Sequence, residues 1–348
     1  MATTVGADPG VVGPYLAQVL GEERWRSVTV DLIAAGMSNL TYVVTPEGGP
    51  DDDAIILRRP PTGAVLATAH DMGREHRVIS ALGPTEVPVP RTLHLETDPS
   101  VLGAPFYLME RVVGVHVTDQ LPPGYADDPA GRRALADGLV DTLAALHQVD
   151  PAAVGLADFG RPEGFLARQV RRWTGQWDAT RDTDRPGLDA LAARLAETVP
   201  PTRRTGIVHG DFRMDNCLLD PQTPGRVRAV LDWEMSTLGD PLTDLALLFV
   251  YWPEAGDEQS IALSRVTALP GFPTRAEVAE HYAGRTGADL GHLSWYVGFA
   301  YFKFAAILAG IVARSAAGAM AGKDTAGYAD KIDPCVELGR AALDDGAL

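Results

Sequence analysis

Short hydrophobic runs separated by turns dominate the first hundred or so residues of the chain, and this pattern predicts β-strands. The runs are Ser27–Ala34, Leu40–Thr45, Ala54–Arg59, Arg91–Glu96 and Phe106–Val112. One stretch differs: Ala69–Leu82 spaces its apolar residues as one face of a helix and ends at Gly83-Pro84. This part of the chain is therefore expected to be rich in strands, with a single helix.

After Gly114 the apolar positions follow a helical period. Arg132–Gln148, Gly164–Trp177 and Gly187–Val199 fit amphipathic helices, and helices return from Pro241 through Ala342. Between them, Thr205–Leu231 shows short β-like runs around a polar loop. The pattern predicts an α+β fold of two lobes, a small β-rich N-terminal lobe over residues 1–112 and a large, mostly helical C-terminal lobe over residues 113–348.

The segment Trp295–Ala313 is apolar and long enough to span a bilayer. However, Lys303 stands at its centre and no second span accompanies it, so a buried helix and no membrane association are expected. The first residues show neither a basic region nor an apolar run, so no signal peptide is expected. With only Cys217 and Cys335 in the chain, a cytoplasmic location is expected.

The formal net charge of −16 argues against nucleic-acid binding, which requires a basic face. Lysines are rare: the chain has only Lys303, Lys323 and Lys331, and all other cations are arginines. The first 302 residues therefore contain no lysine, which bears on how a phosphate could be held there.

The strongest chemical signal is His209-Gly-Asp-Phe-Arg-Met-Asp-Asn216, followed by Val227-Arg-Ala-Val-Leu-Asp232-Trp-Glu234. Its spacing is that of the protein-kinase catalytic loop, with glycine in place of the usual arginine. Phosphoryl transfer needs a carboxylate to take the proton of the attacking hydroxyl, oxygen ligands for Mg²⁺, and a cation near the transferring group. We assign Asp211 to the first role, Asn216 and Asp232 to the second, and Arg213 to the third.

These motifs resemble those of the aminoglycoside phosphotransferase and choline kinase superfamily over nearly the whole chain. More narrowly, Gly36–Thr41, Leu57–Pro61, Arg74-Glu75 and Gly239-Asp-Pro241 are similar to the kinase domains associated with acyl-CoA dehydrogenases. The resemblance implies a protein-kinase-like two-lobed fold, ATP and Mg²⁺ as cofactors, and a small-molecule hydroxyl acceptor. It also implies structural roles for His209 and Asp244.

In the first lobe, a strand cation should grip the ATP phosphates and a helix glutamate should orient it. Since no lysine is present, we expect Arg58 in this role with Glu75 as its partner. Arg59 would face the other side of the sheet, but the following Pro60 leaves open which of the two arginines points inward. An exposed pair of strand-end arginines is the alternative.

Ser38 and Asn39, after Gly36, could donate hydrogen bonds to phosphate oxygens, although a plain β-turn explains this segment equally well. The adenine edge is expected to meet main-chain groups of Glu110 and Val112 in the connector between the lobes. The expected acceptor is a hydroxyacyl-type or other non-aminoglycoside metabolite, and the sequence predicts neither which one nor an oligomeric state.

The alternatives to transfer onto such an acceptor are an aminoglycoside or other antibiotic kinase, or an ATP-binding pseudokinase without transfer. Phosphorylation of proteins is disfavoured because the connectors that follow Asp232 are short and leave little room for an activation segment. Metal-dependent hydrolysis is disfavoured because His209 has no neighbouring histidine at metal-ligand spacing.

Overall fold

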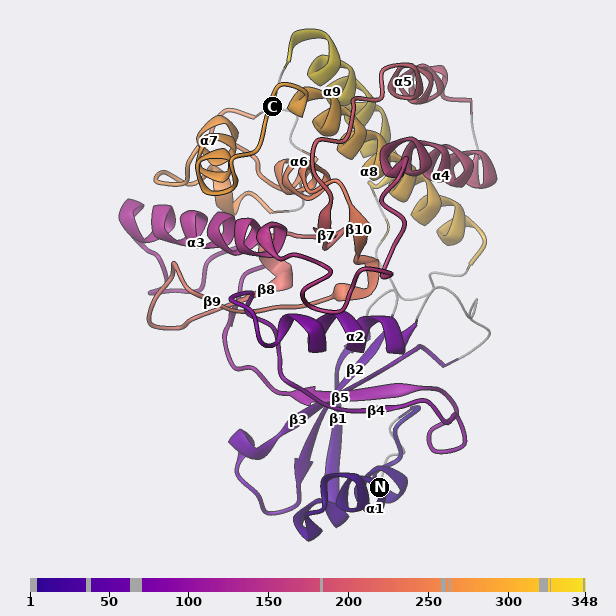
Figure 1. The fold of residues 1–348 in the computed structure, drawn as a ribbon, viewed down its shortest axis with the longest axis vertical. Helices are drawn as coiled ribbons and strands as arrows, with labels where there is room; N and C mark the ends of the chain where they lie inside the picture. The colour runs from indigo at the N-terminus through magenta and orange to yellow at the C-terminus, as the bar shows by residue number, and fades with distance from the viewer. Residues whose placement is uncertain are drawn as a thin grey trace. The chain divides into compact units, whose positions relative to one another are not determined.

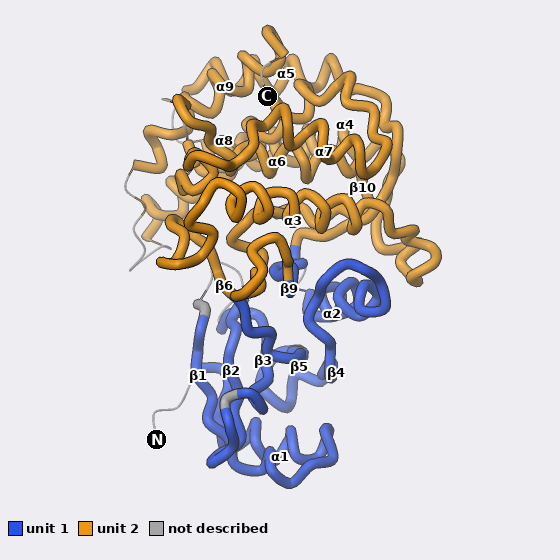
Figure 2. The backbone as a smooth tube through the Cα atoms, turned by 90° about the vertical axis from the view of Figure 1, so that its left-hand side faces the viewer, with its two compact units in different colours: residues 1–114, 228–234 blue, residues 115–227, 235–348 orange. Residues whose placement is uncertain are grey.

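The protein divides into two compact units (Figure 2). Unit 1 comprises residues 1–114 and 228–234, and unit 2 comprises residues 115–227 and 235–348. The computed structural model describes residues 5–35, 39–62, 71–181, 184–257, 261–262, 264–318, 325, 327–346 and 348. The sequence placed a boundary at residue 112, close to this division, but it assigned residues 228–234 to the helical lobe, whereas they group with unit 1.

Unit 1 is built on a five-stranded antiparallel sheet (Figure 1). Its strands are β1 (Val28–Ala35), β2 (Leu40–Pro46), β3 (Ile55–Arg59), β4 (Thr92–Glu96) and β5 (Phe106–Glu110). They lie in the order β1-β2-β3-β5-β4, so that β3 is central, with Leu57 opposite both Tyr42 of β2 and Leu108 of β5. All five strands overlap the runs predicted from sequence.

Two helices cover opposite faces of this sheet. Tyr15 of α1 (Pro9–Leu20) makes an edge contact with Phe106, whereas His76 of α2 (Met72–Leu82) makes one with Tyr107. Neighbouring strand residues point to opposite faces, so these two contacts lie on different sides. The sequence prediction missed α1, although Asp8 caps its N-terminus, Pro9 opens it and left-handed Gly21 ends it.

Unit 2 is mostly helical. Its helices are α3 (Pro129–Gln148), α4 (Phe165–Thr180), α5 (Pro186–Glu197), α6 (Leu242–Val250), α7 (Arg275–Thr286), α8 (Leu293–Ala316) and α9 (Ile332–Asp345). Helix α8 packs against α4, α5, α6 and α9, which buries most of its side chains. Within the described part of the chain it is the helix that is apolar and long enough to cross a membrane, and its burial within unit 2 confirms the expectation of a core helix.

Short strands frame the loop that carries the conspicuous motif. They are β6 (Val115–His116), β7 (Gly206–Val208), β8 (Cys217–Leu219), β9 (Val227–Val230) and β10 (Thr237–Gly239). Strand β7 pairs with β10, and β6 pairs with β8, both antiparallel. The loop of residues 209–216, here called the Asp211 loop, therefore runs from β7 to β8, two strands of different sheets. Its last turn is the 3₁₀ segment Met214–Asn216.

Candidate active site

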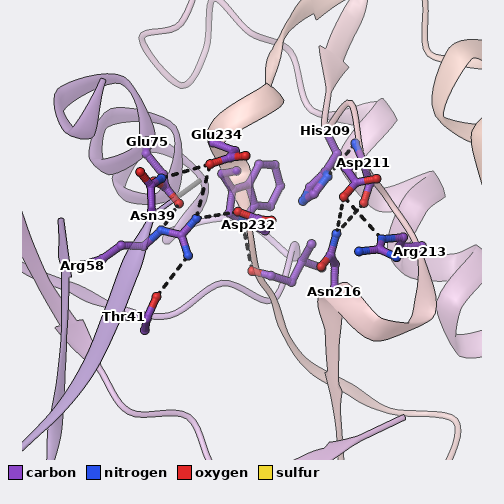
Figure 3. A network of polar contacts seen from close by, with 12 residues as sticks. Asn39, Thr41, Arg58, Glu75, His209, Asp211, Arg213, Asn216, Asp232 and Glu234 are labelled. Carbon is purple, nitrogen blue, oxygen red and sulfur yellow. Dashed lines mark hydrogen bonds and ion pairs between the residues drawn. The ribbon is translucent and has the colours of Figure 1, made fainter. Parts of the chain in front are cut away.

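Arg58 lies at the centre of a partly buried ionic group in unit 1 (Figure 3). Its Nε is 2.9 Å from Glu75 Oε1, its Nη2 is 2.5 Å from Asp232 Oδ1, and Glu234 Oε2 lies 3.9 Å from the same nitrogen. Asn39 donates from its amide to Glu234 at 3.0 Å and to Glu75 at 3.5 Å. We call these five residues the Arg58 cluster.

Strand alternation decides between the two candidate arginines. Arg58 projects from β3 on the face that α2 covers, where it meets Glu75 of that helix. Arg59 projects on the other face and donates to the backbone carbonyls of Gly6 and Leu102. Arg58 therefore makes the ion pair with Glu75 expected from sequence. Arg59 instead links β3 by hydrogen bonds to the segments that contain Gly6 and Leu102.

Asp232 adopts a backbone conformation that side chains rarely take, with φ of +64°. A non-glycine residue in the left-handed region costs of order 1 kcal/mol or more, and such strain concentrates at functional sites. Here the strained residue is the one that places a carboxylate on Arg58. Sequence analysis did not assign Glu234 to the site, although it ends the Asp232-Trp-Glu234 motif that was already recognised.

The Arg58 cluster holds three carboxylates against one cation. Burial raises the pKa of Glu75, and the Arg58 guanidinium only partly offsets this effect. Burial opposes the charge of Arg58, but the neighbouring Glu75, Asp232 and Glu234 outweigh it, so its pKa is raised. The cluster is therefore rich in carboxylate oxygens, the ligands that Mg²⁺ prefers.

The other residues predicted to bind the nucleotide differ in which of their hydrogen-bonding groups are already used inside the protein. Ser38 lies outside the described residues. Asn39 is buried, and its amide is already engaged by Glu234 and Glu75. The Glu110 N–H donates to the Arg91 carbonyl at 2.9 Å, which leaves only its carbonyl for an adenine edge, whereas no described residue hydrogen-bonds the main chain of Val112.

In unit 2, backbone hydrogen bonds set the start of the Asp211 loop. Asp244, from α6, accepts from the N–H of His209 at 2.7 Å and from the N–H of Gly210 at 2.8 Å. Lys303, from α8, donates to the Gly210 carbonyl at 2.8 Å. The peptide groups just before Asp211 are thus held from both sides, and Asp244 has the supporting place that the family resemblance implied.

Glycine is required at position 210. Its φ is +86°, and a Cβ built there would lie 2.7 Å from the Met235 carbonyl oxygen. The arginine that protein kinases carry at this place in the motif cannot fit here without moving the backbone. His209 is fully buried and its Nδ1 accepts from the Asp211 N–H at 3.2 Å, which agrees with a structural role.

Asp244 is itself held by a buried histidine. His147 of α3 lies with Nε2 3.2 Å from Asp244 Oδ2 and with Nδ1 2.7 Å from the Tyr282 hydroxyl. Burial alone would raise the pKa of Asp244, but the hydrogen bonds from His147 and the loop backbone outweigh it and lower the pKa. The carboxylate is therefore kept ionised, which strengthens its bonds to the loop.

Asp211 is gripped by the other predicted residues of its loop (Figure 3). The Asn216 amide donates to the Asp211 carbonyl at 2.7 Å and to its Oδ2 at 3.0 Å, and Arg213 Nε donates to Oδ2 at 3.3 Å. Arg213 also pairs with Asp215 at 2.7 Å and lies over the Tyr251 ring. Asp211, Arg213 and Asn216 are thus brought together within one unit, as their spacing predicted.

The donor set fits Mg²⁺ on one clear observation. Asn216 uses its amide nitrogen to hold Asp211, while its Oδ1 has no hydrogen-bond partner within the described chain. That oxygen in unit 2 is a hard ligand of the kind Mg²⁺ takes, and so, taken by itself in unit 1, is the Asp232 carboxylate. No group of three or more His, Cys, Asp or Glu side chains that could hold a metal by themselves occurs among the described residues, and Mg²⁺ in such sites relies on one or two carboxylates plus substrate phosphates.

Comparison with known proteins identifies the class. Residues 29–281 match the profile of the phosphotransferase enzyme family, so the chain belongs to that family. It is 36% identical over 308 residues to acyl-CoA dehydrogenase family member 10 of Mus musculus, covering 87% of this chain and 28% of the mouse protein. The chain thus spans less than a third of that relative, and the resemblance inferred from the sequence motifs is confirmed.

Solved structures agree with this assignment. A candidate aminoglycoside phosphotransferase from Ralstonia eutropha JMP134 superposes with a TM-score of 0.82 at 33% identity, covering 97% of this chain and 98% of that one. Choline kinase from Cryptosporidium parvum reaches a TM-score of 0.60 at 14% identity, covering 92% and 91%, which shows the fold alone. The predicted kinase-like α+β fold is confirmed.

Proposed function

We propose that this protein transfers the γ-phosphate of ATP to a hydroxyl group of a small molecule that is not an aminoglycoside, with a hydroxyacyl compound as the favoured acceptor class. The observation that carries the proposal is the Asp211 loop. Asn216 and Arg213 hydrogen-bond the Asp211 carboxylate, and Asp244 and Lys303 hydrogen-bond the N–H and the carbonyl of Gly210 just before it. In this proposal Asp211 accepts the hydroxyl proton while the new O–P bond forms, and ADP leaves as the bond to its β-phosphate oxygen breaks.

The Arg58 cluster supplies the nucleotide side of the proposal. Arg58, oriented by Glu75, would hold the α- and β-phosphates, and Glu110 and Val112 would meet the adenine through their main chain. Asn216 and Asp232 would hold Mg²⁺, which neutralises phosphate charge when it is bound. The two cysteines, both free and buried, fit the cytoplasmic location that we propose with this activity.

The charge of α8 supports an acceptor other than an aminoglycoside. Aminoglycosides are polycations, and a site for them needs several carboxylates. Helix α8 contains no acidic residue, whereas it carries Lys303 and Arg314. Of the two acidic residues at the end of α9, Asp344 and Asp345, the first is already paired with Arg194. The similarity to the acyl-CoA dehydrogenase relative favours an acceptor of hydroxyacyl type.

An ADP-release assay tests the proposal. Hydroxyacyl-CoA thioesters and hydroxy acids should be phosphorylated, and kanamycin-class compounds should not. Efficient transfer to the antibiotics, with kcat/KM of roughly 10⁴ M⁻¹s⁻¹ or above, would establish the competing antibiotic-kinase function. ATP binding without ADP release for any acceptor would instead indicate a pseudokinase.

A further inference from the structure

Two cations flank one tryptophan in unit 2. Lys303 Nζ of α8 and Arg172 Cζ of α4 each lie 5.5 Å from the centroid of the Trp173 ring. The indole is buried, and its Nε1 has no hydrogen-bond partner in the described part of the chain. An indole N–H can only donate, so this buried donor lacks an acceptor.

Neither cation has an acidic partner among the described residues. The other described cation–π arginines all do: Arg24 pairs with Glu22 and Asp53, Arg181 with Asp178, Asp184 and Asp189, and Arg213 with Asp211 and Asp215. Asp211 and Asp244 lie near enough to favour the charge of Lys303, and Arg172 is exposed to solvent, but neither cation makes a direct ion pair with a described carboxylate, so both are available to a further anion.

The position of Lys303 links this charge to the proposed chemistry. An ammonium group has three donors, and the Gly210 carbonyl accepts one of them at 2.8 Å. Gly210 directly precedes Asp211, so the other two donors lie close to the residue proposed as the base. Burial of the ammonium has an energetic cost that an anion bound beside it would offset.

We propose that Trp173, Arg172 and Lys303, here called the Trp173 site, bind an oxyanion of the acceptor and thereby place its hydroxyl group at Asp211. This proposal rests on the function proposed above and makes it more specific. The oxyanion is either the carboxylate of a hydroxy acid or a phosphate of a coenzyme A thioester. Both offer acceptors for the indole N–H and for the two cations.

The test compares three acceptors that differ in charge: 3-hydroxybutyrate, 3-hydroxybutyryl-CoA and neutral 1,3-butanediol. Lys303→Met and Arg172→Gln should each lower kcat/KM for the charged acceptor by about 10- to 100-fold, as expected for lost hydrogen bonds to a charged group. Arg172→Gln should change the value for the diol less than about threefold. Lys303→Met should also lower the value for the diol, because Lys303 holds the Gly210 carbonyl, but clearly less than for the charged acceptor, and Lys303→Arg should retain most of the wild-type preference. An effect confined to the acid identifies a carboxylate, and one confined to the thioester identifies a phosphate.

Arg171→Gln is the matched control, because it removes the same charge from the adjacent position of α4, which is exposed as Arg172 is. It should leave all three acceptors unchanged. If Lys303→Met lowers the rate equally for the diol and the charged acceptors, Lys303 serves only to hold the Gly210 carbonyl, and the proposal is overturned. Thermal melting of each variant shows whether it is folded.

Failure of the proposed function has a different signature. If wild-type protein releases no ADP with any of these acceptors, transfer to a hydroxyl of this class is ruled out. Calorimetry with the same compounds then tests the anion site alone. Weaker binding of 3-hydroxybutyrate or the thioester by Lys303→Met, but not by Arg171→Gln, supports the Trp173 site, and equal or undetectable binding overturns it.

Discussion

The Arg58 cluster and the Asp211 loop are positioned by different means. In the cluster, side chains hold side chains. Arg58 lies beside three carboxylates, and one of them belongs to Asp232, whose backbone is in the strained left-handed region. In the loop, side chains hold backbone: Asp244 and Lys303 fix the peptide groups before Asp211. The cluster has carboxylates in excess and suits a cationic or metal-bearing ligand, whereas the loop fixes the place of a single reacting group.

This contrast predicts that changes in the Asp211 loop mainly alter the rate of transfer, and that changes in the Arg58 cluster mainly alter nucleotide binding. The following experiments test this division between effects on rate and effects on nucleotide binding.

Asp211→Asn should give the largest effect. Loss of a general base typically costs 10²- to 10⁴-fold in kcat, while affinity for Mg·ATP should stay nearly unchanged. Steady-state kinetics and nucleotide calorimetry measure the two quantities separately. A variant that keeps more than about a tenth of the wild-type kcat removes Asp211 from this role.

Asp232→Ala should abolish the Mg²⁺-dependent part of nucleotide binding and leave the fold intact, because Glu75 and Glu234 remain beside Arg58. Calorimetry with ATP, with and without Mg²⁺, measures this. Equal dependence on Mg²⁺ in variant and wild type contradicts the assignment of Asp232 as a metal ligand.

Arg58→Ala should raise KM for ATP and lower kcat. Arg58→Lys should retain part of the activity, because lysine keeps the charge, but not all of it, because lysine lacks the planar guanidinium. Arg59→Ala is the control. It should have much less effect on kinetics, and its cost should appear as a lower melting temperature because two backbone carbonyls lose their donor. The reverse ranking of the two arginines in KM for ATP is incompatible with our placement of the phosphates.

Asp244→Asn should reduce the free energy of unfolding by about 3 kcal/mol, because it breaks a buried ionic hydrogen-bond group. The pKa of Asp244 is lowered in the folded protein, so its contribution is present above the usual carboxyl pKa and is lost as pH falls through the lowered value. Urea unfolding at neutral pH and near pH 3 should show the difference between variant and wild type shrinking in acid. A difference that is constant with pH would falsify the ionised state of Asp244.

The smallest effect concerns pH and the Trp173 site. Burial, together with the nearby Arg172, lowers the pKa of Lys303, although Asp211 and Asp244 oppose the shift. Lys303 should therefore lose its charge at a lower pH than an exposed lysine, and KM for a charged acceptor should rise as that charge is lost. Lys303→Arg should remove that rise, because arginine stays protonated. A pH profile shared by both proteins excludes Lys303 as its source.

Sequence reasoning found the parts of the site that local pattern determines. The spacing from His209 to Asn216 predicted one loop with its side chains together, and strand alternation favoured Arg58 over Arg59 at the Glu75 pair. Helix α1 was missed because its apolar residues alternate with small and polar ones among predicted strands. Glu234 was not assigned to the site because its partner is distant in sequence: Asn39 reaches Glu234 across 195 positions.

The discontinuity of unit 1 has a consequence for the nascent chain. Residues 1–114 are synthesised before the rest of unit 1, and they already contain the whole sheet, both helices and the Arg58–Glu75 pair. Asp232 and Glu234 arrive only after residues 115–227 have been made, and α8, which brings Lys303, arrives later still. A chain that ended at residue 227 would contain the complete sheet, but Arg58 would still lack Asp232 and Glu234. The Asp211 loop would be present without Asp244 and Lys303, which hold it. Both groups are therefore completed late in biosynthesis.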